Sequence, residues 1–501
     1  MTPAEPAVTL TPAVRPAWLR FLDKFLVLQS AIRELWLVFM VKFLAIAAYA
    51  LTNSTLVLWL SSDLGYSDGQ AGWLVAAWSV AITAFTLVVG SLTDAIGFRR
   101  TFFLGTWICA FARAVLVFTP WRWLALLAGL FPLALGEALG GPVLVASVRR
   151  YSNTRQRSVS FSISYTMMNL GFLLAAYIFD KLRHGLGEYG HWGVLGVQIS
   201  TYRTLFLASL GLELSVLPFI YLLRRGAEAT DTGVTLAPQQ PKYAGCPLWE
   251  SIWLTTREGA VEAARLFRGL FRQSGFYRLL GFLLFIAFIK LIYKQLDYVY
   301  PKFGVRELGE GAPIGMLVGI NYILIIPLAP VVGALTQRFS AYKMVILGGA
   351  LSAASVFIMA LPPAWFQSLA HGWLGDLVGH RYLGLAAAVP VHPYYVMIAL
   401  FVVLLSFGEA FYSPRVYEYA AAIAPKGQEA SYSALSYVPF LVAKVLVGSF
   451  SGFLLTNFCP EHGPRHSGTL WLIVALTASI APVGLVLFRR FIQVQEAGRA
   501  E

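Results

Sequence analysis

Two stretches of this sequence repeat one pattern. Residues 135–142 read Leu-Gly-Glu-Ala-Leu-Gly-Gly-Pro, and residues 407–414 read Phe-Gly-Glu-Ala-Phe-Tyr-Ser-Pro. The same offset continues downstream, and each copy places a glutamate, Glu137 or Glu409, within an apolar run. Self-similarity at a long period in an apolar chain is typical of a duplicated membrane transporter. The pattern predicts that both glutamates lie near a shared pseudo-twofold axis.

The composition indicates an integral membrane protein. The chain has 501 residues, of which 58% are hydrophobic and only 13% are charged, whereas a soluble protein carries about 25% charged residues. The net charge of +13 could indicate nucleic-acid binding. We expect no nucleic-acid partner, because the basic residues are concentrated in alternate connecting loops, as the positive-inside rule predicts. The lipid bilayer is the expected environment.

Apolar stretches of about 20 residues, the length of a transmembrane helix, occur along the whole chain. They predict an all-α membrane protein with twelve transmembrane helices in two pseudo-symmetric six-helix bundles. The expected helices cover residues 36–60, 70–92, 100–120, 122–146, 158–180, 202–222, 278–300, 313–336, 342–361, 393–420, 431–457 and 468–489.

Loop charges predict the orientation. Loop 61–69 contains two aspartates and no basic residue, whereas loops 93–101, 147–157 and 223–277 carry arginines. Both termini and the central loop are therefore expected in the cytoplasm, with the protein in the plasma (cell inner) membrane.

This orientation gives a domain plan. Residues 1–35 show no cleavable signal peptide, residues 226–247 resemble a flexible linker, and residues 248–272 resemble an amphipathic helix on the membrane surface. The expected parts are a cytoplasmic N-terminal amphipathic segment (1–35), an N-terminal six-helix bundle (36–222), a cytoplasmic linker (223–277), a C-terminal bundle (278–490) with an extracytoplasmic insertion (362–392), and a cytoplasmic tail (491–501).

No metal site, cofactor or enzyme activity is expected. The cysteines and the histidines of the insertion match no compact ligand spacing, so packing and solvated-loop roles are expected for them. They are Cys109, Cys246, Cys459, His371, His380 and His392.

A loop motif indicates the superfamily. Residues 90–100 read Gly-Ser-Leu-Thr-Asp-Ala-Ile-Gly-Phe-Arg-Arg, and residues 333–343 keep the Gly-x-Leu-Thr start and the final cation but lack the acid and the second glycine. The motif resembles the signature loop of the major facilitator superfamily. The resemblance implies a cytoplasmic latch that favours the outward-facing state; the alternative is a turn that only sets topology. The latch residues would be Gly90, Asp94, Gly97, Arg99 and Arg100.

Further stretches resemble the proton-coupled oligopeptide transporter branch of that superfamily. They lie at residues 161–171, 321–330 and 408–426. By this resemblance, Glu409 matches the glutamate that receives a substrate amino group. The Glu-x-x-Glu-Arg motif of the branch is absent from the first helix, where only Lys42 remains, and Tyr-Glu-Gln is replaced by Tyr-Lys-Gln around Lys294. The chain is therefore identified as a divergent relative in which peptide selectivity and the usual proton relay do not follow.

Ionisable residues within the predicted helices are the main site candidates, because a charge at mid-bilayer costs roughly 2.5–3.5 kcal/mol on insertion scales. With polar companions, the substrate-binding or coupling candidates are Lys42, Tyr49, Asn53, Arg113, Glu137, Tyr165, Asn169, Lys290, Lys294, Asp297, Asn321, Glu409 and Lys444; Glu213 is a further buried acid.

Structural alternatives stay open for these residues. Glu409 could brace Lys444 or Lys42, and Glu137 could pair with Arg113. Residues 290, 294 and 297 share a helical face, so an acid or an anionic substrate group is expected between the two lysines, unless the helix frays there and they are wet. Lys444 could snorkel, and the polar companions could form interhelical hydrogen bonds.

The sequence thus predicts a secondary active transporter that works by alternating access. The expected solute is small, polar and zwitterionic or anionic, peptide-like solutes included. Protons are the expected coupling ion, and the chain is expected to be a monomer. The alternative is a transporter-fold sensor or scaffold that binds a ligand without net transport. A channel is disfavoured because the buried charges have mixed sign.

Overall fold

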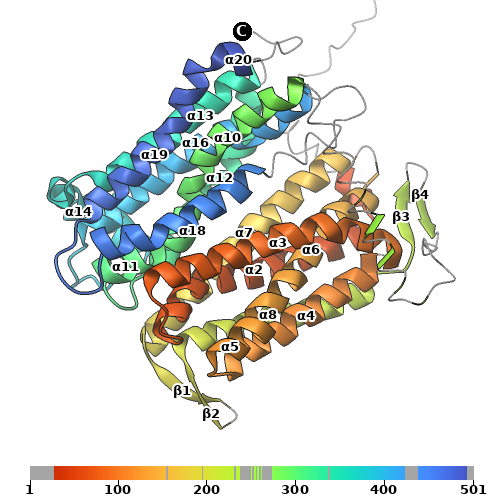
Figure 1. The fold of residues 1–501 in the computed structure, drawn as a ribbon, viewed down its shortest axis with the longest axis horizontal. Helices are drawn as coiled ribbons and strands as arrows, with labels where there is room; N and C mark the ends of the chain where they lie inside the picture. Colours follow the sequence, from red (N-terminus) through yellow and green to blue (C-terminus); the bar gives the residue numbers. More distant parts are fainter. Residues whose placement is uncertain are drawn as a thin grey trace, which may run out of the picture.

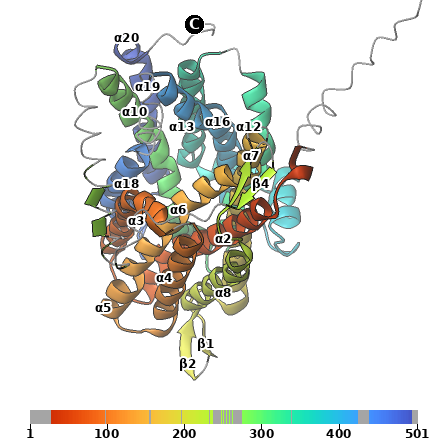
Figure 2. The same ribbon diagram turned by 90° about the vertical axis from the view of Figure 1, so that its right-hand side faces the viewer.

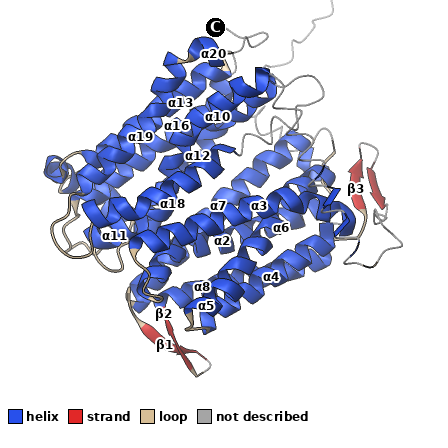
Figure 3. Cartoon of the chain, in the orientation of Figure 1, coloured by secondary structure: helices blue, strands red, loops and turns tan. Residues whose placement is uncertain are grey.

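The computed structural model describes residues 27–96, 98–153, 156–194, 196–230, 233–236, 274–336, 339–423 and 438–493, with isolated positions between 247 and 261. Almost all of this chain is helical, and the strands form two small hairpins (Figure 3).

Six long helices form the N-terminal half. The fourth of them is reached through the short α5 (Arg122–Leu124) and the π-helical η2 (Ala125–Leu130), which join it without a break. The six are α2 (Arg33–Ser62), α3 (Asp68–Ile96), α4 (Phe98–Phe118), α6 (Phe131–Arg150), α7 (Arg157–Leu186) and α8 (Thr201–Leu222).

Six further helices form the C-terminal half. The first of them is followed by α11 (Tyr300–Leu308) and the last by α20 (Arg489–Ile492). The six are α10 (Ser274–Tyr298), α12 (Ile314–Leu335), α13 (Ala341–Ala360), α16 (Pro393–Ile423), α18 (Val438–Phe458) and α19 (Ser467–Leu487).

The twelve predicted apolar stretches are all helices, so the predicted all-α fold is confirmed. Eleven helices in the described part of the chain are long and apolar enough to cross a membrane. The remaining long helix is α3, which has 29 residues.

The two halves are separate groups of helices. In Figure 1 the N-terminal half (red to yellow) lies below the C-terminal half (green to blue), and Figure 2 shows α10, α13, α16 and α19 above α2, α4 and α8. The halves meet where α3 packs on α18 and α7 packs on α12.

The repeated Gly-Glu-Ala motif has the same packing role in both halves. A Cβ added to Gly136 on α6 would lie 3.1 Å from the carbonyl oxygen of Gly105 on α4, and one added to Gly408 on α16 would lie 2.8 Å from that of Gly348 on α13. Small residues let membrane helices approach closely. The glutamate that follows each glycine is therefore held at an equivalent place in its own half.

One end of the molecule is closed by ion pairs between the halves; we call it the closed end. Asp68, at the start of α3, accepts hydrogen bonds from Lys302 at 2.5 Å and from Arg306 at 2.9 Å, both on α11. The cavity beside them, about 530 Å³, includes Glu461 in its lining. Because each pair joins residues of different halves, the contacts hold the halves together at this end.

A second group of closed-end contacts joins α7 to the segment before α12. Arg183 is fully buried, binds the Glu188 carboxylate at 2.9 Å and donates to the carbonyl oxygen of Ala312 in the other half at 3.1 Å. The Glu188 carboxylate also accepts from the backbone N–H of Gly311, at 3.0 Å. Asp180 accepts from two N–H groups in the first turn of α12, a place that favours an acid.

The hairpins correct one expectation and add an element. The interpretation of 226–247 as flexible linker is wrong for the antiparallel pair β3 (Ala227–Thr230) and β4 (Gly233–Leu236). The second hairpin, β1 (His191–Val194) with β2 (Val197–Ser200), was not predicted and lies at the opposite end of the molecule (Figure 1).

Two other predicted segments have different outcomes. The expected amphipathic helix over 248–272 lies mostly outside the described residues, although isolated positions such as Trp253 are helical. The insertion 362–392 contains four short helical turns, which are η3 (Pro363–Phe366), α14 (Gln367–Ala370), α15 (Trp373–Gly375) and the π-helical η4 (Asp376–Tyr382).

Candidate transport site

A buried arginine organises the N-terminal half. Arg113 on α4 donates to Glu137 on α6 at 2.5 Å and to Glu213 on α8 at 3.1 Å. Its Nε atom donates to Ser209 at 2.7 Å and to Thr52 at 3.2 Å. These contacts tie four helices together through one guanidinium. The structural pairing of Glu137 with Arg113 is therefore the arrangement observed, and Glu213 shares it.

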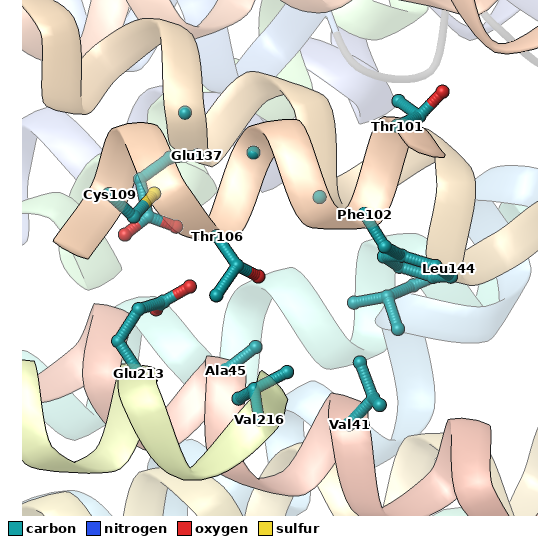
Figure 4. Close-up of a pocket in the computed structure, with 13 residues that line it drawn as sticks. Val41, Ala45, Thr101, Phe102, Thr106, Cys109, Glu137, Leu144, Glu213 and Val216 are labelled. Atoms are coloured by element: carbon teal, nitrogen blue, oxygen red, sulfur yellow. The ribbon is translucent and has the colours of Figure 1, made fainter. Parts of the chain in front are cut away.

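A narrow cavity begins at this pair of acids. Figure 4 shows Glu137 from α6 and Glu213 from α8 on opposite sides of it, with Thr106 of α4 between them. The cavity has a volume of about 30 Å³, and its lining extends to Phe102 and Leu144. It lies inside the N-terminal half and not between the halves.

The repeat mate of Glu137 has a different partner. Glu409 on α16 accepts a hydrogen bond from the Asn321 side-chain amide at 3.0 Å, and the same amide donates to Ser406 at 3.0 Å. Glu409 is thus bound by a neutral donor, whereas Glu137 is bound by a cation. The equivalent position in the two halves has acquired different chemistry.

The two lysines considered as braces for Glu409 bind elsewhere. Lys42 donates to Ser164 on α7 at 2.8 Å. Lys444 on α18 donates to the Ser79 carbonyl oxygen at 3.1 Å and to the Thr83 hydroxyl at 3.2 Å, both on α3 of the other half. Neither lysine forms the brace in this conformation.

The lysines of α10 have separate environments. Lys290 is 7% exposed, and its Nζ atom lies 4.7 Å from the centroid of the Tyr412 ring, a cation–π contact. It is within electrostatic range of Glu409. Lys294 forms an ion pair with Asp297. Asp297 therefore serves as the acid for Lys294, and α10 stays helical to Tyr298 and does not fray at these residues.

A tyrosine lies within electrostatic range of each of the two glutamates. Tyr49 stacks on Trp78 and is within electrostatic range of Glu137 and Asp297. Tyr322 stacks on Phe172 of the other half, with ring centroids 5.1 Å apart, and is within range of Asp297 and Glu409. Each glutamate thus has a tyrosine within electrostatic range, and the place of the two at a shared axis stays a prediction.

Three polar candidates have local roles. The Asn169 amide donates to the carbonyl oxygen of Tyr165 one turn earlier, at 3.0 Å. Tyr165 packs against the apolar cluster around Ile325 and Ala410, in the other half. The third candidate, Asn53, is a buried residue that is 7% exposed. Tyr165 thus belongs to the contact between α7 and the C-terminal half.

The predicted latch is partly described. Helix α3 includes Gly90 and Asp94, but their side chains and all of Gly97 lie outside the described residues. Arg99 donates to the Tyr221 carbonyl oxygen at the end of α8, at 2.8 Å, and Arg100 is exposed. The latch role stays a prediction.

Sequence reasoning missed the closed-end residues. Asp68 was read only as a loop charge, and Asp180, Arg183 and Glu188 fall at or beyond the predicted end of their helix. A cluster of alternating charges within a few residues of a helix end was the available signal. In the described part of the chain, no three His, Cys, Asp or Glu residues gather as a potential metal site.

Two helical halves, buried charges between their helices, and eleven helices in the described residues that are long and apolar enough to cross a membrane define a polytopic membrane transporter. The sequence profile of the Major Facilitator Superfamily matches residues 38–379, more than half of the chain. The chain belongs to this superfamily. Among curated proteins, no sequence matches it.

Solved structures share the whole fold. A POT family transporter in complex with 5-aminolevulinic acid has a TM-score of 0.67 and 16% identity, over 92% of this chain and 97% of that chain. A POT family transporter in complex with a thioalcohol-conjugated peptide has a TM-score of 0.67 and 16% identity, over 93% of this chain and 100% of that chain. At this identity the likeness shows the fold, and the expected similarity to peptide transporters is confirmed at that level.

Proposed function

We propose that this chain is a secondary active transporter that moves a small zwitterionic or anionic solute, peptide-like solutes included, by alternating access and with proton coupling. The observation that carries the proposal is Glu409, a half-buried carboxylate whose hydrogen bond comes from the neutral Asn321 amide. A carboxylate in such a place is free to exchange this bond for a substrate ammonium group or a proton.

The lysines of the C-terminal half support the substrate class, and one of them, Lys290, lies within electrostatic range of Glu409. Lys290, Lys294 and Lys444 all lie within electrostatic range of one another or of Asp297. A solute with one carboxylate and one ammonium group would find partners of both signs across the contact between the halves. The ligands named for the similar structures, 5-aminolevulinic acid and a conjugated peptide, carry both kinds of group and support the same class.

The contacts at the closed end indicate which conformational state of a transporter this structure represents. With both termini in the cytoplasm, as the loop charges predict, the closed end faces the outside of the plasma membrane. The structure would then be a state closed to the outside, held by the Asp68 and Glu188 contacts. One chain contains both halves of the proposed site, which supports a monomer as the working unit.

The test combines ligand discovery with transport. Purified protein is screened by thermal unfolding against amino acids, peptides and organic anions, because a true ligand raises the melting temperature by mass action. The best ligand is then followed in proteoliposomes under a pH gradient. We expect Glu409→Gln to abolish accumulation, whereas Glu228→Gln on the exposed β3 strand leaves it unchanged. Normal accumulation by Glu409→Gln would overturn the proposed role of Glu409.

The sensor or scaffold alternative has its own outcome in this experiment. A protein that binds the ligand with a clear thermal shift, yet shows no counterflow of labelled ligand in liposomes, would support it. Counterflow separates the two functions because it needs the site to face both sides in turn but needs no coupling ion.

A further inference from the structure

We propose that Arg113, Glu137 and Glu213 form a second, separate protonation site, which exchanges one proton with the cytoplasm through the narrow cavity inside the N-terminal half. The inference rests on the proposed function in one respect: if transport is coupled to protons, this site would bind a coupling proton away from Glu409. The proton, carried by water, is the ligand of this site.

Charge balance is the first argument. One guanidinium binds two carboxylates; Arg113 and Glu213 are buried and Glu137 is partly buried, with side-chain exposed fractions of 0%, 6% and 14%. With both acids ionised the site has a net charge of −1. An uncompensated buried charge is costly, and one proton on either carboxylate removes it. Arg113 stays protonated throughout.

The surrounding helices supply no second cation. In the sequence, residues 69–93 of α3, 131–148 of α6 and 204–222 of α8 contain no lysine or arginine. On α2 the nearest cation is Lys42, which binds Ser164 on α7. The other titratable groups facing the site are the Cys109 thiol and the Tyr49 phenol. A proton is therefore the charge that can balance the site without any rearrangement of helices.

The cavity is the second argument, because a proton needs water to reach a buried acid. Its space of about 30 Å³ for water centres holds about two water molecules. It extends from the two carboxylates along α4 and α6 to Thr101 and Leu144, which are buried side chains near the start of α4 and the end of α6 (Figure 4). This is the end of the molecule where the loop charges predict the cytoplasm. Thr106 lies between the two acids on this route (Figure 4).

Glu137 connects this route to the rest of the transporter. It lines the cavity, and it is also within electrostatic range of Tyr49, beside the contact between the halves. A proton that arrives from between the halves can bind a Glu137 oxygen, move through a cavity water molecule to a Glu213 oxygen and leave to water in the cavity. Only O–H bonds form and break in these steps.

Direct titration tests the site without any substrate. Purified protein is titrated with acid while the infrared C=O stretching band of protonated carboxyl groups is recorded. Among the carboxyl bands that appear on acidification, we expect one component that is lost in Glu213→Gln and in Glu137→Gln but kept in Glu409→Gln and Glu228→Gln. Bands that are the same in the unmodified protein and in both N-terminal variants would overturn the proposal. Two acid variants are used so that one misfolded variant does not decide the result.

A matched pair of glycines tests the route. A Cβ at Gly140 or at Gly141 meets nothing within 4 Å, but only Gly140 lines the cavity. Gly140→Leu should therefore fill the cavity and slow hydrogen–deuterium exchange at the titrating carboxyl at least several-fold, whereas Gly141→Leu should not. Equal exchange rates in the two variants would overturn the cytoplasmic route.

The outcomes also separate this site from the proposed function. If no solute is transported but the band is lost in Glu213→Gln, the protonation site stands and the transport proposal fails. If accumulation depends on Glu409 but neither N-terminal variant changes the band, the transport proposal stands and the protonation site fails.

Discussion

Lys444 and Ser79 join the two halves of the molecule at the middle of their contact. The lysine ammonium, on α18, donates to the Ser79 carbonyl oxygen on α3 at 3.1 Å, and the Thr83 hydroxyl accepts a second bond at 3.2 Å. Both acceptors are neutral, so the positive charge is kept at the contact and is not cancelled by an acid. The interpretation of Lys444 as a snorkelling lysine does not describe this contact.

Removing that ammonium should shift the conformational equilibrium. Lys444→Met keeps most of the side-chain volume but loses both bonds, and hydrogen bonds to charged groups contribute about 1.5–3 kcal/mol. We expect the closed end to open in a larger share of molecules, by roughly tenfold or more. Spin labels at His191 and Trp373, exposed positions at the closed end of different halves, would report longer distances. Thr83→Val removes only one acceptor and should give a smaller shift; unchanged distances in both variants would contradict this role.

The ion pairs of Asp68 should contribute more to closure than an exposed pair does. Asp68→Asn leaves Lys302 and Arg306, which are 4% and 10% exposed, without their acid, and a broken buried pair costs about 3–5 kcal/mol. The same spin labels should report longer distances across the closed end. Asp376→Asn is the control, because its pair with Arg381 is exposed on both sides and contributes little. Equal effects of the two substitutions would contradict the closing role of Asp68.

The repeated glycines should be equally intolerant of a methyl group. In Gly136→Ala and Gly408→Ala the new Cβ would lie 2.5 Å from the Cys109 sulfur and 2.3 Å from the Ser352 hydroxyl oxygen. Overpacking of this kind typically costs about 1–3 kcal/mol. We expect both variants to melt several degrees lower in detergent, whereas Gly141→Ala, where a Cβ meets nothing within 4 Å, changes little. A strong effect in only one half would contradict the shared packing role.

Much of the fold could be predicted from the sequence because it depends on periodic apolar length. The helix at 36–60 is observed as Arg33–Ser62, and the one at 468–489 as Ser467–Leu487. The β3–β4 hairpin was missed because a four-residue strand in a polar segment has no such signal. Its turn-forming residues indicate a linker and a hairpin equally well.

The site was predicted less completely, for a physical reason. Intramembrane charge is visible in a sequence, so Arg113, Glu137 and Glu409 were identified. Partner choice depends on where side chains point in space. Nothing in the order of residues says that Lys444 binds α3 and not Glu409, or that one arginine holds two acids. Closed-end residues such as Glu188 were missed because loop charges are ordinarily solvated.

Acid should weaken the closed end through Glu188. Burial acts to raise the pKa of this carboxyl, but the Arg183 guanidinium, the Tyr202 hydroxyl and the Gly311 N–H outweigh burial and hold its pKa below the usual range. A lowered pKa means that Glu188 stabilises the folded protein fully above the unfolded value, about 4.3. That contribution is lost as the pH falls through the lower folded value.

The measurement is a melting temperature followed from pH 7 into the acid range. Glu188→Gln leaves the buried Arg183 with a weaker partner, so we expect a lower melting temperature at pH 7 and a flatter loss on acidification than in the unmodified protein. Glu228→Gln, with its half-exposed side chain, should keep the full acid dependence. If Glu188→Gln loses as much stability on acidification as the unmodified protein does, other groups govern the acid response. Glu188 is then a packing residue whose charge matters little, and closure must depend on the Asp68 pairs instead.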